Sequence, residues 1–202
     1  MTPIHAVILA GGQGQRLGGV RKAELRIGGV RLIDRVATAL GPVETPLLVA
    51  TGPEHPAPRG DFVGVADLTV PVGGPLAGVA AAVDWLANRG ITEGLLVSVA
   101  VDTPFLPADF VARMQQALGA HDAAYASWGS EFYPPNALWR LPALQTLPER
   151  VRAGTAPKSL KALLSTGDAV ACDWHAAAAP NPFENLNTLG DLVRLGRRAQ
   201  RV

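Results

Sequence analysis

A glycine-rich segment near the N-terminus carries the residues with the clearest potential for chemistry. Residues 9–22 read LAGGQGQRLGGVRK, with five glycines among the nine positions 11–19, directly after the apolar run Ile4–Leu9. Glycines let the backbone turn tightly and approach a ligand, and successive N–H groups in such a turn bind anions. Arg16 and Lys22 add positive charge to the same segment, as binding of a phosphate chain requires. The segment is therefore predicted to bind the phosphates of a nucleotide.

Two common phosphate-binding motifs are excluded for this segment. The Walker motif needs Gly-Lys followed by Ser or Thr, whereas Lys22 lies between Arg21 and Ala23. The dinucleotide motif needs a third glycine where this chain has Leu17. A glycine-rich surface loop without a ligand is the alternative. The position of the segment after a predicted buried strand favours the nucleotide site, because open α/β sheets bind ligands at the carboxyl ends of their strands.

An aspartate stands at the end of another predicted strand. Asp102 follows the apolar run Gly94–Val101 and precedes Thr-Pro. Magnesium prefers hard oxygen ligands and typically takes one or two protein carboxylates together with substrate phosphates. We therefore predict that Asp102 binds Mg²⁺ beside a triphosphate; the alternative is that it caps the turn into a helix near Pro107.

Two asparagines precede the last predicted helix. Asn185 and Asn187 alternate with apolar residues, and Thr188 with Asp191 has the spacing of a helix capping box. Alternate residues of a strand point to one face, so both amides are predicted to serve one site. Hydrogen bonding to the backbone of a turn is the alternative reading for these amides.

Short apolar runs and helical patterns alternate along the chain and must position these residues. The predicted strands are Ile4–Leu9, Pro46–Ala50, Phe62–Ala66, Gly94–Val101, Ala123–Trp128, Ala137–Arg140 and Val170–Trp174. Helical patterns cover Arg31–Leu40, a stretch from Pro75, a stretch from about Pro107, Arg150–Leu164 and the residues after Thr188. This β-α-β order predicts a mostly parallel sheet with helices on both faces.

The composition limits the class of protein. The 202 residues suit one domain, residues 1–202, and 48% hydrophobic with 17% charged residues exclude a mainly disordered chain. A net charge of +1 gives no general attraction to nucleic acid or to a membrane surface. The lone Cys172 excludes an internal disulfide and a cysteine-based zinc site. We expect a soluble cytoplasmic protein, because the N-terminal apolar run is too short to span a bilayer.

Four motifs in order resemble those of a known family. They are the segment 9–22 described above, Gly74-Pro75-Leu76-Ala77-Gly78, Asp102-Thr103-Pro104-Phe105-Leu106-Pro107, and Asn185-Leu186-Asn187-Thr188. Together they resemble the molybdenum cofactor guanylyltransferases, the MobA-like nucleotidyltransferases. The resemblance covers most of the chain and is weak only between about residues 120 and 180. It implies a single-domain, three-layer α/β/α sandwich with a Rossmann-like sheet of the nucleotide-diphospho-sugar transferase type.

The resemblance also implies an activity and a set of site residues. The activity is Mg²⁺-dependent transfer of GMP from GTP to the phosphate of molybdopterin, with release of pyrophosphate. Lys22, Arg16 and Asp102 are the implied catalytic residues, and Asp102 with Asn187 the implied metal ligands. The implied nucleotide-binding residues are Leu9, Ala10, Gly11, Gly12, Gly14, Lys22, Asp67, Gly74, Pro75, Leu76, Gly78 and Asp102. Asp67 is expected to accept hydrogen bonds from guanine.

Some residues depart from the family pattern and leave alternatives open. Ala50 stands where many relatives have asparagine, and Tyr133-Pro134-Pro135-Asn136-Ala137 where they have His-Pro. The alternatives are a cytidylyltransferase acting on molybdopterin or on an isoprenoid or sugar phosphate, and a nucleotide-binding partner protein without catalysis. Ala10-Gly11-Gly12, where cytidylyl-transferring relatives have Ala-Ala-Gly, favours GTP. The resemblance further implies transient contact with molybdenum cofactor donor or acceptor proteins, and we expect a monomer.

Overall fold

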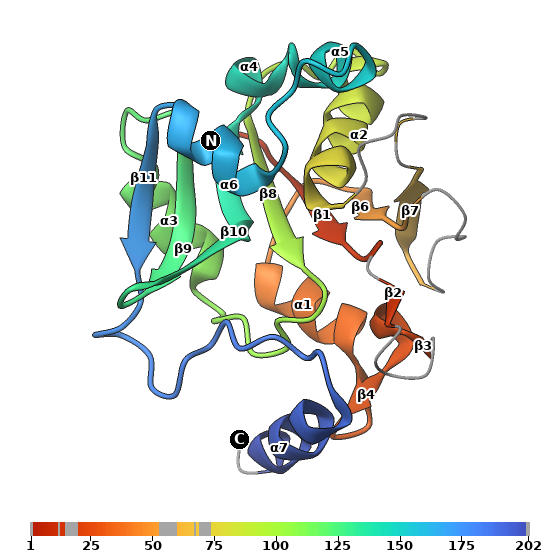
Figure 1. Cartoon of the computed structure of the whole chain (residues 1–202), viewed down its shortest axis with the longest axis vertical. Coiled ribbons are helices and arrows are strands. Elements are labelled where there is room, and N and C mark those ends of the chain that lie inside the picture. The colour runs from red at the N-terminus through yellow and green to blue at the C-terminus, as the bar shows by residue number, and fades with distance from the viewer. Residues whose placement is uncertain are drawn as a thin grey trace.

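The protein is built around one seven-stranded sheet (Figure 1). The computed structural model describes residues 2–11, 13–14, 20–52, 60–66, 68 and 74–200. From one edge to the other the strands are β11 (Ala169–Asp173), β9 (Ala123–Trp128), β10 (Glu131–Arg140), β8 (Leu95–Ala100), β1 (Ile4–Leu9), β6 (Leu47–Ala50) and β7 (Phe62–Val65). Every neighbouring pair is parallel except those of β10, which runs antiparallel to both β8 and β9. The predicted mostly parallel sheet is confirmed.

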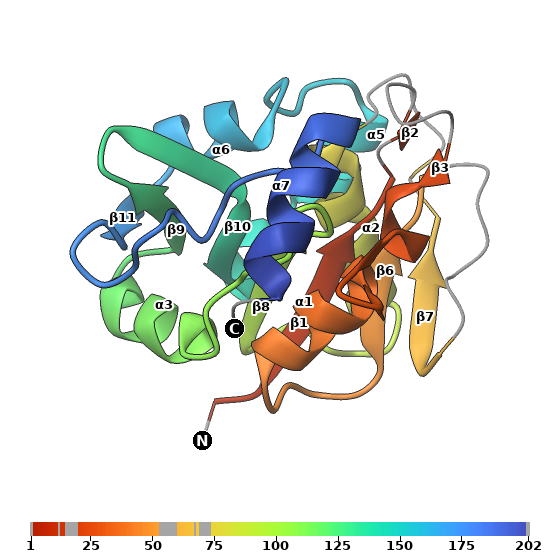
Figure 2. The ribbon, with the colours of Figure 1, turned by 90° about the horizontal axis from the view of Figure 1, so that it is seen from below.

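Helices cover both faces of this sheet, and Figure 2 shows the two helical layers with the sheet between them. One face carries α1 (Leu32–Leu40) and α3 (Phe110–Leu118); the other carries α2 (Pro75–Ala87), α4 (Leu141–Leu144), α5 (Leu147–Arg152) and α6 (Leu160–Thr166). The last helix, α7 (Leu189–Ala199), lies beyond the strand ends, against residues 26–27 (Figure 1). The remaining elements are the pairs β2 (Gln13–Gly14) with β3 (Val20–Arg21) and β4 (Arg26–Ile27) with β5 (Val30–Arg31), and the 3₁₀ turn η2 (Lys22–Glu24). The three-layer α/β/α class is confirmed.

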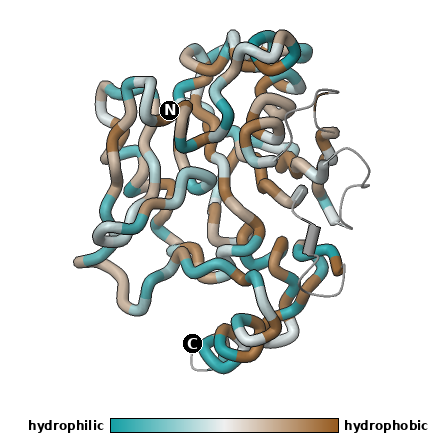
Figure 3. Tube along the Cα trace, in the orientation of Figure 1, coloured by the Kyte–Doolittle hydropathy of each residue, from teal (hydrophilic) through white to brown (hydrophobic). Residues whose placement is uncertain are grey.

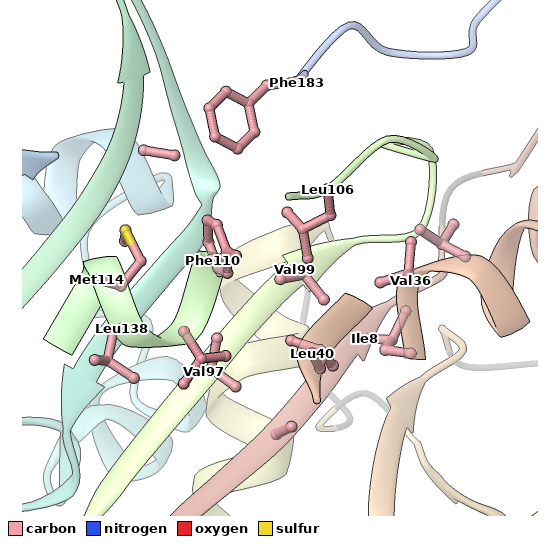
Figure 4. Packing of buried hydrophobic residues seen from close by; sticks show 14 of the residues in the cluster. Ile8, Val36, Leu40, Val97, Val99, Leu106, Phe110, Met114, Leu138 and Phe183 are labelled. Carbon is pink, nitrogen blue, oxygen red and sulfur yellow. The ribbon is translucent and has the colours of Figure 1, made fainter. Parts of the chain in front are cut away.

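The alternation of side chains along the strands produces two separate apolar layers. Ile8 packs on the α1 and α3 face, where Figure 4 shows it with Val99 near Val36 and Leu40 of α1. Its neighbour Val7 packs on the α2 face. Because the central strands are buried on both faces, they read as continuous apolar runs, and Figure 3 shows this hydrophobic colouring in the middle of the molecule.

Two details of the predicted secondary structure are wrong. The helical stretch predicted over Arg150–Leu164 is divided into α5 and α6, because Gly154 has a φ of +70°, which ends a helix. Residues 185–187 form no strand, although they keep the predicted alternation: Leu186 is buried, and Asn185 and Asn187 are exposed. None of the helices in the described ranges is long and apolar enough to cross a membrane.

The last helix begins with the predicted capping box. The Thr188 hydroxyl accepts a hydrogen bond from the Asp191 N–H, and the Asp191 carboxylate accepts one from the Thr188 N–H. A hydrogen bond from Arg194, with further ones from the Asn187 and Thr188 N–H groups, lowers the pKa of Asp191 to about 2. The capping box thus fixes the start of α7 directly after Asn187.

Replacing Asp191 by Asn should therefore destabilise the protein in a pH-dependent manner. At pH 7 we expect a loss of about 1 kcal/mol of unfolding free energy, the usual effect of losing a cap. The folded-state pKa lies below the unfolded value of about 3.9, so the stabilisation by Asp191 is complete above pH 4 and fades as the pH falls towards 2. Urea unfolding of both proteins at pH 7, 5 and 3 measures this difference.

The matched control is Asp109→Asn, since Asp109 precedes α3 without a side-chain capping hydrogen bond. This variant should unfold like the unmodified protein at every pH. A difference between Asp191→Asn and the unmodified protein that stays constant from pH 7 to pH 3 would contradict the role given to the carboxylate.

Candidate active site

A cavity of about 240 Å³ opens at the carboxyl ends of β1, β6 and β8. Leu9, Ala50 and Ala100 are the last residues of these three strands and lie in register with one another. The full lining is Leu9, Gly11, Lys22, Ala50, Gly74, Pro75, Gly78, Ala100, Val101, Asp102, Tyr133, Pro135, Asn136 and Asn185. The cavity therefore lies where parallel α/β sheets bind their ligands.

Helix α2 approaches these strand ends very closely. A Cβ atom built on Gly78 would lie 2.8 Å from the Ala50 Cβ and 2.9 Å from the Leu9 Cδ2. Only a residue without a side chain fits this contact, so glycine at position 78 sets the distance between the helix and the sheet. Ala50 places a methyl group here, so the position that the family resemblance gives to asparagine offers no polar group.

The N-terminus of α2 forms one wall of the cavity. Gly74 has a φ of +88°, a backbone conformation that favours glycine, and Pro75 occupies the first turn of the helix. Both residues line the cavity. The first turn of a helix leaves N–H groups without intrahelical partners and carries a partial positive charge. This wall therefore offers hydrogen-bond donors to polar or anionic groups.

Three residues from distant parts of the chain meet at one point beside the cavity. The Lys22 Nζ donates a hydrogen bond of 2.7 Å to the Asp102 Oδ2 and one of 2.6 Å to the Asn187 Oδ1. The lysine and aspartate side chains are only 12% and 20% exposed. Lys22 starts η2, Asp102 follows β8, and Asn187 precedes α7, so three separate elements position this contact.

The segment that carries the two asparagines is attached directly to the metal-ligand candidate. The Leu186 N–H donates a hydrogen bond of 2.9 Å to the backbone oxygen of Asp102. Burial of Leu186 turns the residues on either side outward: Asn185 lines the cavity and Asn187 contacts Lys22. One backbone hydrogen bond and one buried side chain thus place both amides near Asp102.

Strand β10 supplies a further wall that the sequence did not identify as part of the site. The Oδ1 of the buried Asn136 accepts a hydrogen bond of 2.8 Å from the Ala100 N–H. This bond satisfies the last backbone donor of β8. The only sequence signal was a polar residue between two prolines and an apolar run. The family resemblance pointed to this segment as the counterpart of a His-Pro pair, but no site residue was predicted in it.

Tyr133 also lines the cavity and stays protonated at neutral pH. Its hydroxyl donates to the Glu131 carboxylate at 2.6 Å and accepts from the Asn181 amide at 2.6 Å. Burial, and then the bond to Glu131, raises the pKa of Tyr133 to about 12. The tyrosine is therefore a neutral wall of the cavity and is not suited to act as a general base.

The structure brings together most of the predicted site residues that it describes. Leu9, Gly11, Lys22, Gly74, Pro75, Gly78 and Asp102 line the cavity, and Asn187 contacts Lys22. Ala10 and Leu76 do not line it; Leu76 is buried between α2 and the sheet, and the Ala10 N–H donates a hydrogen bond to the Ala50 oxygen. Gly14 lies in β2, paired with Val20. Gly12, Arg16 and Asp67 lie outside the described residues.

The donor set at Asp102 and Asn187 fits a divalent cation of the magnesium type. A carboxylate oxygen and an amide oxygen, both hard ligands, converge on one cationic group, the Lys22 ammonium. The ammonium marks a position where the protein already stabilises positive charge. That Mg²⁺ binds at these two side chains remains a prediction.

The sheet order, the helical layers and a cavity of this kind are those of nucleotide-binding α/β proteins. Comparison with known proteins identifies the family. The MobA-like NTP transferase domain matches residues 6–178, and the chain belongs to this family. It is 40% identical over 196 residues to a molybdenum cofactor guanylyltransferase of Rhodobacter capsulatus, covering 95% of this chain and 94% of the relative. It is 39% identical over 193 residues to a molybdenum cofactor guanylyltransferase of Acidiphilium cryptum, covering 94% of this chain and 92% of that relative.

Solved structures show the same fold. Molybdopterin-guanine dinucleotide biosynthesis protein A from Archaeoglobus fulgidus superposes with a TM-score of 0.74 at 21% identity, covering 98% of this chain and 100% of that protein. The 2-C-methyl-D-erythritol 4-phosphate cytidylyltransferase from Thermus thermophilus superposes with a TM-score of 0.63 at 18% identity, covering 96% of this chain and 98% of that protein. At these identities the likeness extends to the fold alone.

The contact between α2 and the sheet should tolerate no side chain at position 78. Gly78→Ala adds a methyl group where two carbon atoms already lie within 3 Å, and overpacking of this kind costs about 1–3 kcal/mol. The higher helix propensity of alanine offsets up to about 1 kcal/mol of this cost. We expect a net loss of stability in urea unfolding and weaker binding of a fluorescent nucleotide.

Gly196→Ala is the matched control, because Gly196 also lies within a helix and a Cβ there would meet nothing within 4 Å. It should be neutral or stabilising. If Gly78→Ala stabilised the protein as much as this control, the close approach of α2 would not constrain the site.

Proposed function

We propose that this protein is a Mg²⁺-dependent guanylyltransferase that transfers GMP from GTP to the phosphate of molybdopterin and releases pyrophosphate. Its membership of the NTP transferase family and the names of its relatives, which are 30–40% identical, support this activity. The observation that carries the proposal is the position of Lys22. Its ammonium lies between Asp102 and Asn187, at the edge of a cavity formed by the strand ends.

We propose a task for each of the three side chains. Asp102 and Asn187 would hold Mg²⁺, which neutralises the charge of the triphosphate when bound. Lys22 would donate hydrogen bonds to phosphate oxygens in place of its two present partners. Transfer of this type depends mainly on positioning and on electrostatic stabilisation of the leaving pyrophosphate. Arg16 and the amides of the segment 11–14 are proposed to share that stabilisation.

No general base is required in this reaction. The attacking group is a phosphate oxygen, which is already an anion at neutral pH. Tyr133, whose pKa is raised to about 12, contributes a neutral surface. A cavity that offers cations and hydrogen-bond donors suits a reaction in which an anion attacks an anion, because its positive groups reduce the repulsion between them.

The base is proposed to bind at the N-terminal turn of α2. Gly74 and Pro75 line the cavity there, and the free N–H groups of the first turn suit the carbonyl oxygen of guanine. Asp67 is proposed to accept hydrogen bonds from the N1–H and 2-amino groups. Cytosine lacks this pair of donors, so GTP should be preferred over CTP.

The direct test is incubation of the protein with Mg-GTP and molybdopterin, followed by mass spectrometry of the product. We expect the molybdopterin guanine dinucleotide and one pyrophosphate for each dinucleotide formed. CTP in place of GTP should give at most a small fraction of this product. A cytosine dinucleotide as the main product would make the protein a cytidylyltransferase. Nucleotide binding without any product would make it a non-catalytic partner protein.

Removing the charge of Asp102 should abolish most of this activity. Asp102→Asn keeps the shape of the side chain but takes away the carboxylate that contacts Lys22. We expect the rate of pyrophosphate release to fall at least about a hundredfold, the scale for loss of one key electrostatic group. Initial rates at saturating Mg-GTP measure the effect, and the variant's thermal unfolding shows whether it is folded.

The control for this prediction is Asp168→Asn. Asp168 is a 59% exposed carboxylate that pairs with His121 and does not line the cavity. Its loss should leave the rate within about twofold, since surface pairs of this kind contribute little. Normal turnover by a folded Asp102→Asn protein would remove Asp102 from the mechanism.

A further inference from the structure

A second cavity, of about 290 Å³, lies between the β9–β10 pair and helix α6. We call it the ring pocket and define it by its lining: Tyr125, Phe132, Pro134, Lys161, Leu164, Ser165, Gly167 and Ala169. Figure 1 shows α6 next to β10, and these two elements are in contact. The ring pocket shares no lining residue with the cavity at the carboxyl ends of β1, β6 and β8, which we call the nucleotide cavity after its proposed ligand.

Two aromatic rings and one cation meet in the ring pocket. The rings of Tyr125 and Phe132 lie 6.4 Å apart at an angle of 72°, an edge-to-face arrangement. Phe132 is 45% exposed, one of few large apolar side chains so exposed in the described residues. The Lys161 Nζ lies 4.6 Å from the centre of the Phe132 ring. Within the described part of the chain, no carboxylate pairs with Lys161.

This combination is suited to one kind of ligand. An exposed aromatic face stacks flat rings, and an ammonium without a carboxylate partner attracts an anionic substituent. The hydroxyls of Ser165 and Tyr125 add hydrogen-bonding groups at the border. A flat heteroaromatic ring that carries a negative group would therefore satisfy each feature of the ring pocket.

The sheet register places the ring pocket beside the nucleotide cavity. Tyr125 of β9 pairs with Ala137 of β10, and Ala137 pairs with Ser98 of β8. Directly paired residues point to the same face of a sheet, and Ala100, two residues beyond Ser98, lines the nucleotide cavity on this face. Neighbouring strands lie about 4.8 Å apart and each residue rises about 3.3 Å, so two strand spacings and two residues put Tyr125 about 12 Å from the end of β8.

Strand β10 connects the two cavities through successive residues. Phe132 and Pro134 line the ring pocket, whereas Tyr133 and Pro135 line the nucleotide cavity. The two cavities therefore adjoin at residues 134 and 135, where the pairing of β10 with β9 is interrupted. A pterin with its phosphate-bearing side chain is long enough to cover a span of about 12 Å.

We propose that the ring pocket binds the pterin ring of the phosphate acceptor. This inference rests on the proposed function, because it supplies the acceptor subsite for that reaction. Phe132 stacks on the ring, Tyr125 packs against its edge, and Lys161 binds an anionic group attached to it. The subsite thus directs the acceptor phosphate along β10 towards Asp102.

Binding of pterin-6-carboxylate, a fluorescent and stable flat ring with one negative charge, tests the proposal on the full-length protein. Titration followed by fluorescence quenching gives the Kd. Phe132→Ala should weaken binding at least about tenfold, the scale for removing one stacking partner. Binding of a fluorescent GTP analogue with Mg²⁺ should stay unchanged in the same variant, which also shows that the variant is folded.

Lys161→Gln tests the role of the cation separately from stacking. It should weaken binding of pterin-6-carboxylate by about three- to tenfold, yet leave binding of uncharged pterin unchanged, because only the former carries a carboxylate. Lys158→Gln is the matched control, since Lys158 is an exposed lysine three residues away that does not line the ring pocket. This control should bind both probes like the unmodified protein.

Three outcomes would overturn the proposal. They are no binding of pterin-6-carboxylate at about 1 mM, equal binding by Phe132→Ala and the unmodified protein, and displacement of the probe by Mg-GTP. The last result would make the ring pocket a base-binding site. Failure of the proposed function is distinguishable: the protein would then bind pterin-6-carboxylate in a Phe132-dependent manner but form no dinucleotide from GTP.

Discussion

The site depends on one electrostatic constraint: a lysine ammonium held between a carboxylate and an amide that are far apart in the sequence. Lys22 lies 80 residues from Asp102 and 165 from Asn187. The contact therefore exists only when the N-terminal segment, the central strand β8 and the approach to α7 have all reached their final positions. Within this contact the Lys22 ammonium offsets the charge of the Asp102 carboxylate.

The rest of the fold serves to align strand ends and to leave space in front of them. β1, β6 and β8 end in register at Leu9, Ala50 and Ala100. Helix α2 can lie directly on these ends because Gly78 has no side chain. The antiparallel strand β10 then extends the sheet past the cavity. Its Asn136 side chain accepts a hydrogen bond from the Ala100 N–H. The cavity at these strand ends and the ring pocket both use residues of β10.

Much of this arrangement is visible in the sequence because strong local signals carry it. The continuous apolar runs identified the buried strands, Pro75 and Thr188 marked two helix starts, and Asp102 was recognisable as a polar residue at a strand end. The bulged course of β10 was not predictable, because its residue pairing shifts between Tyr133 and Ala137 and two prolines interrupt its pattern. The ring pocket was also hidden, since Phe132 and Lys161 come together only through the packing of α6 on the sheet. The course of β10 and the ring pocket both depend on contacts between elements, which the residue pattern of a single element does not reveal.

The hydrogen bond from Leu186 to Asp102 has a consequence for where the protein can be shortened. The family match ends at residue 178, whereas the chain that reaches back to the end of β8 lies at residues 185–187. A truncation at the family boundary would keep every strand of the sheet and lose the oxygen atom opposite Asp102. The range that the family model matches therefore does not include Asn187, and α7 holds the segment of that residue in place.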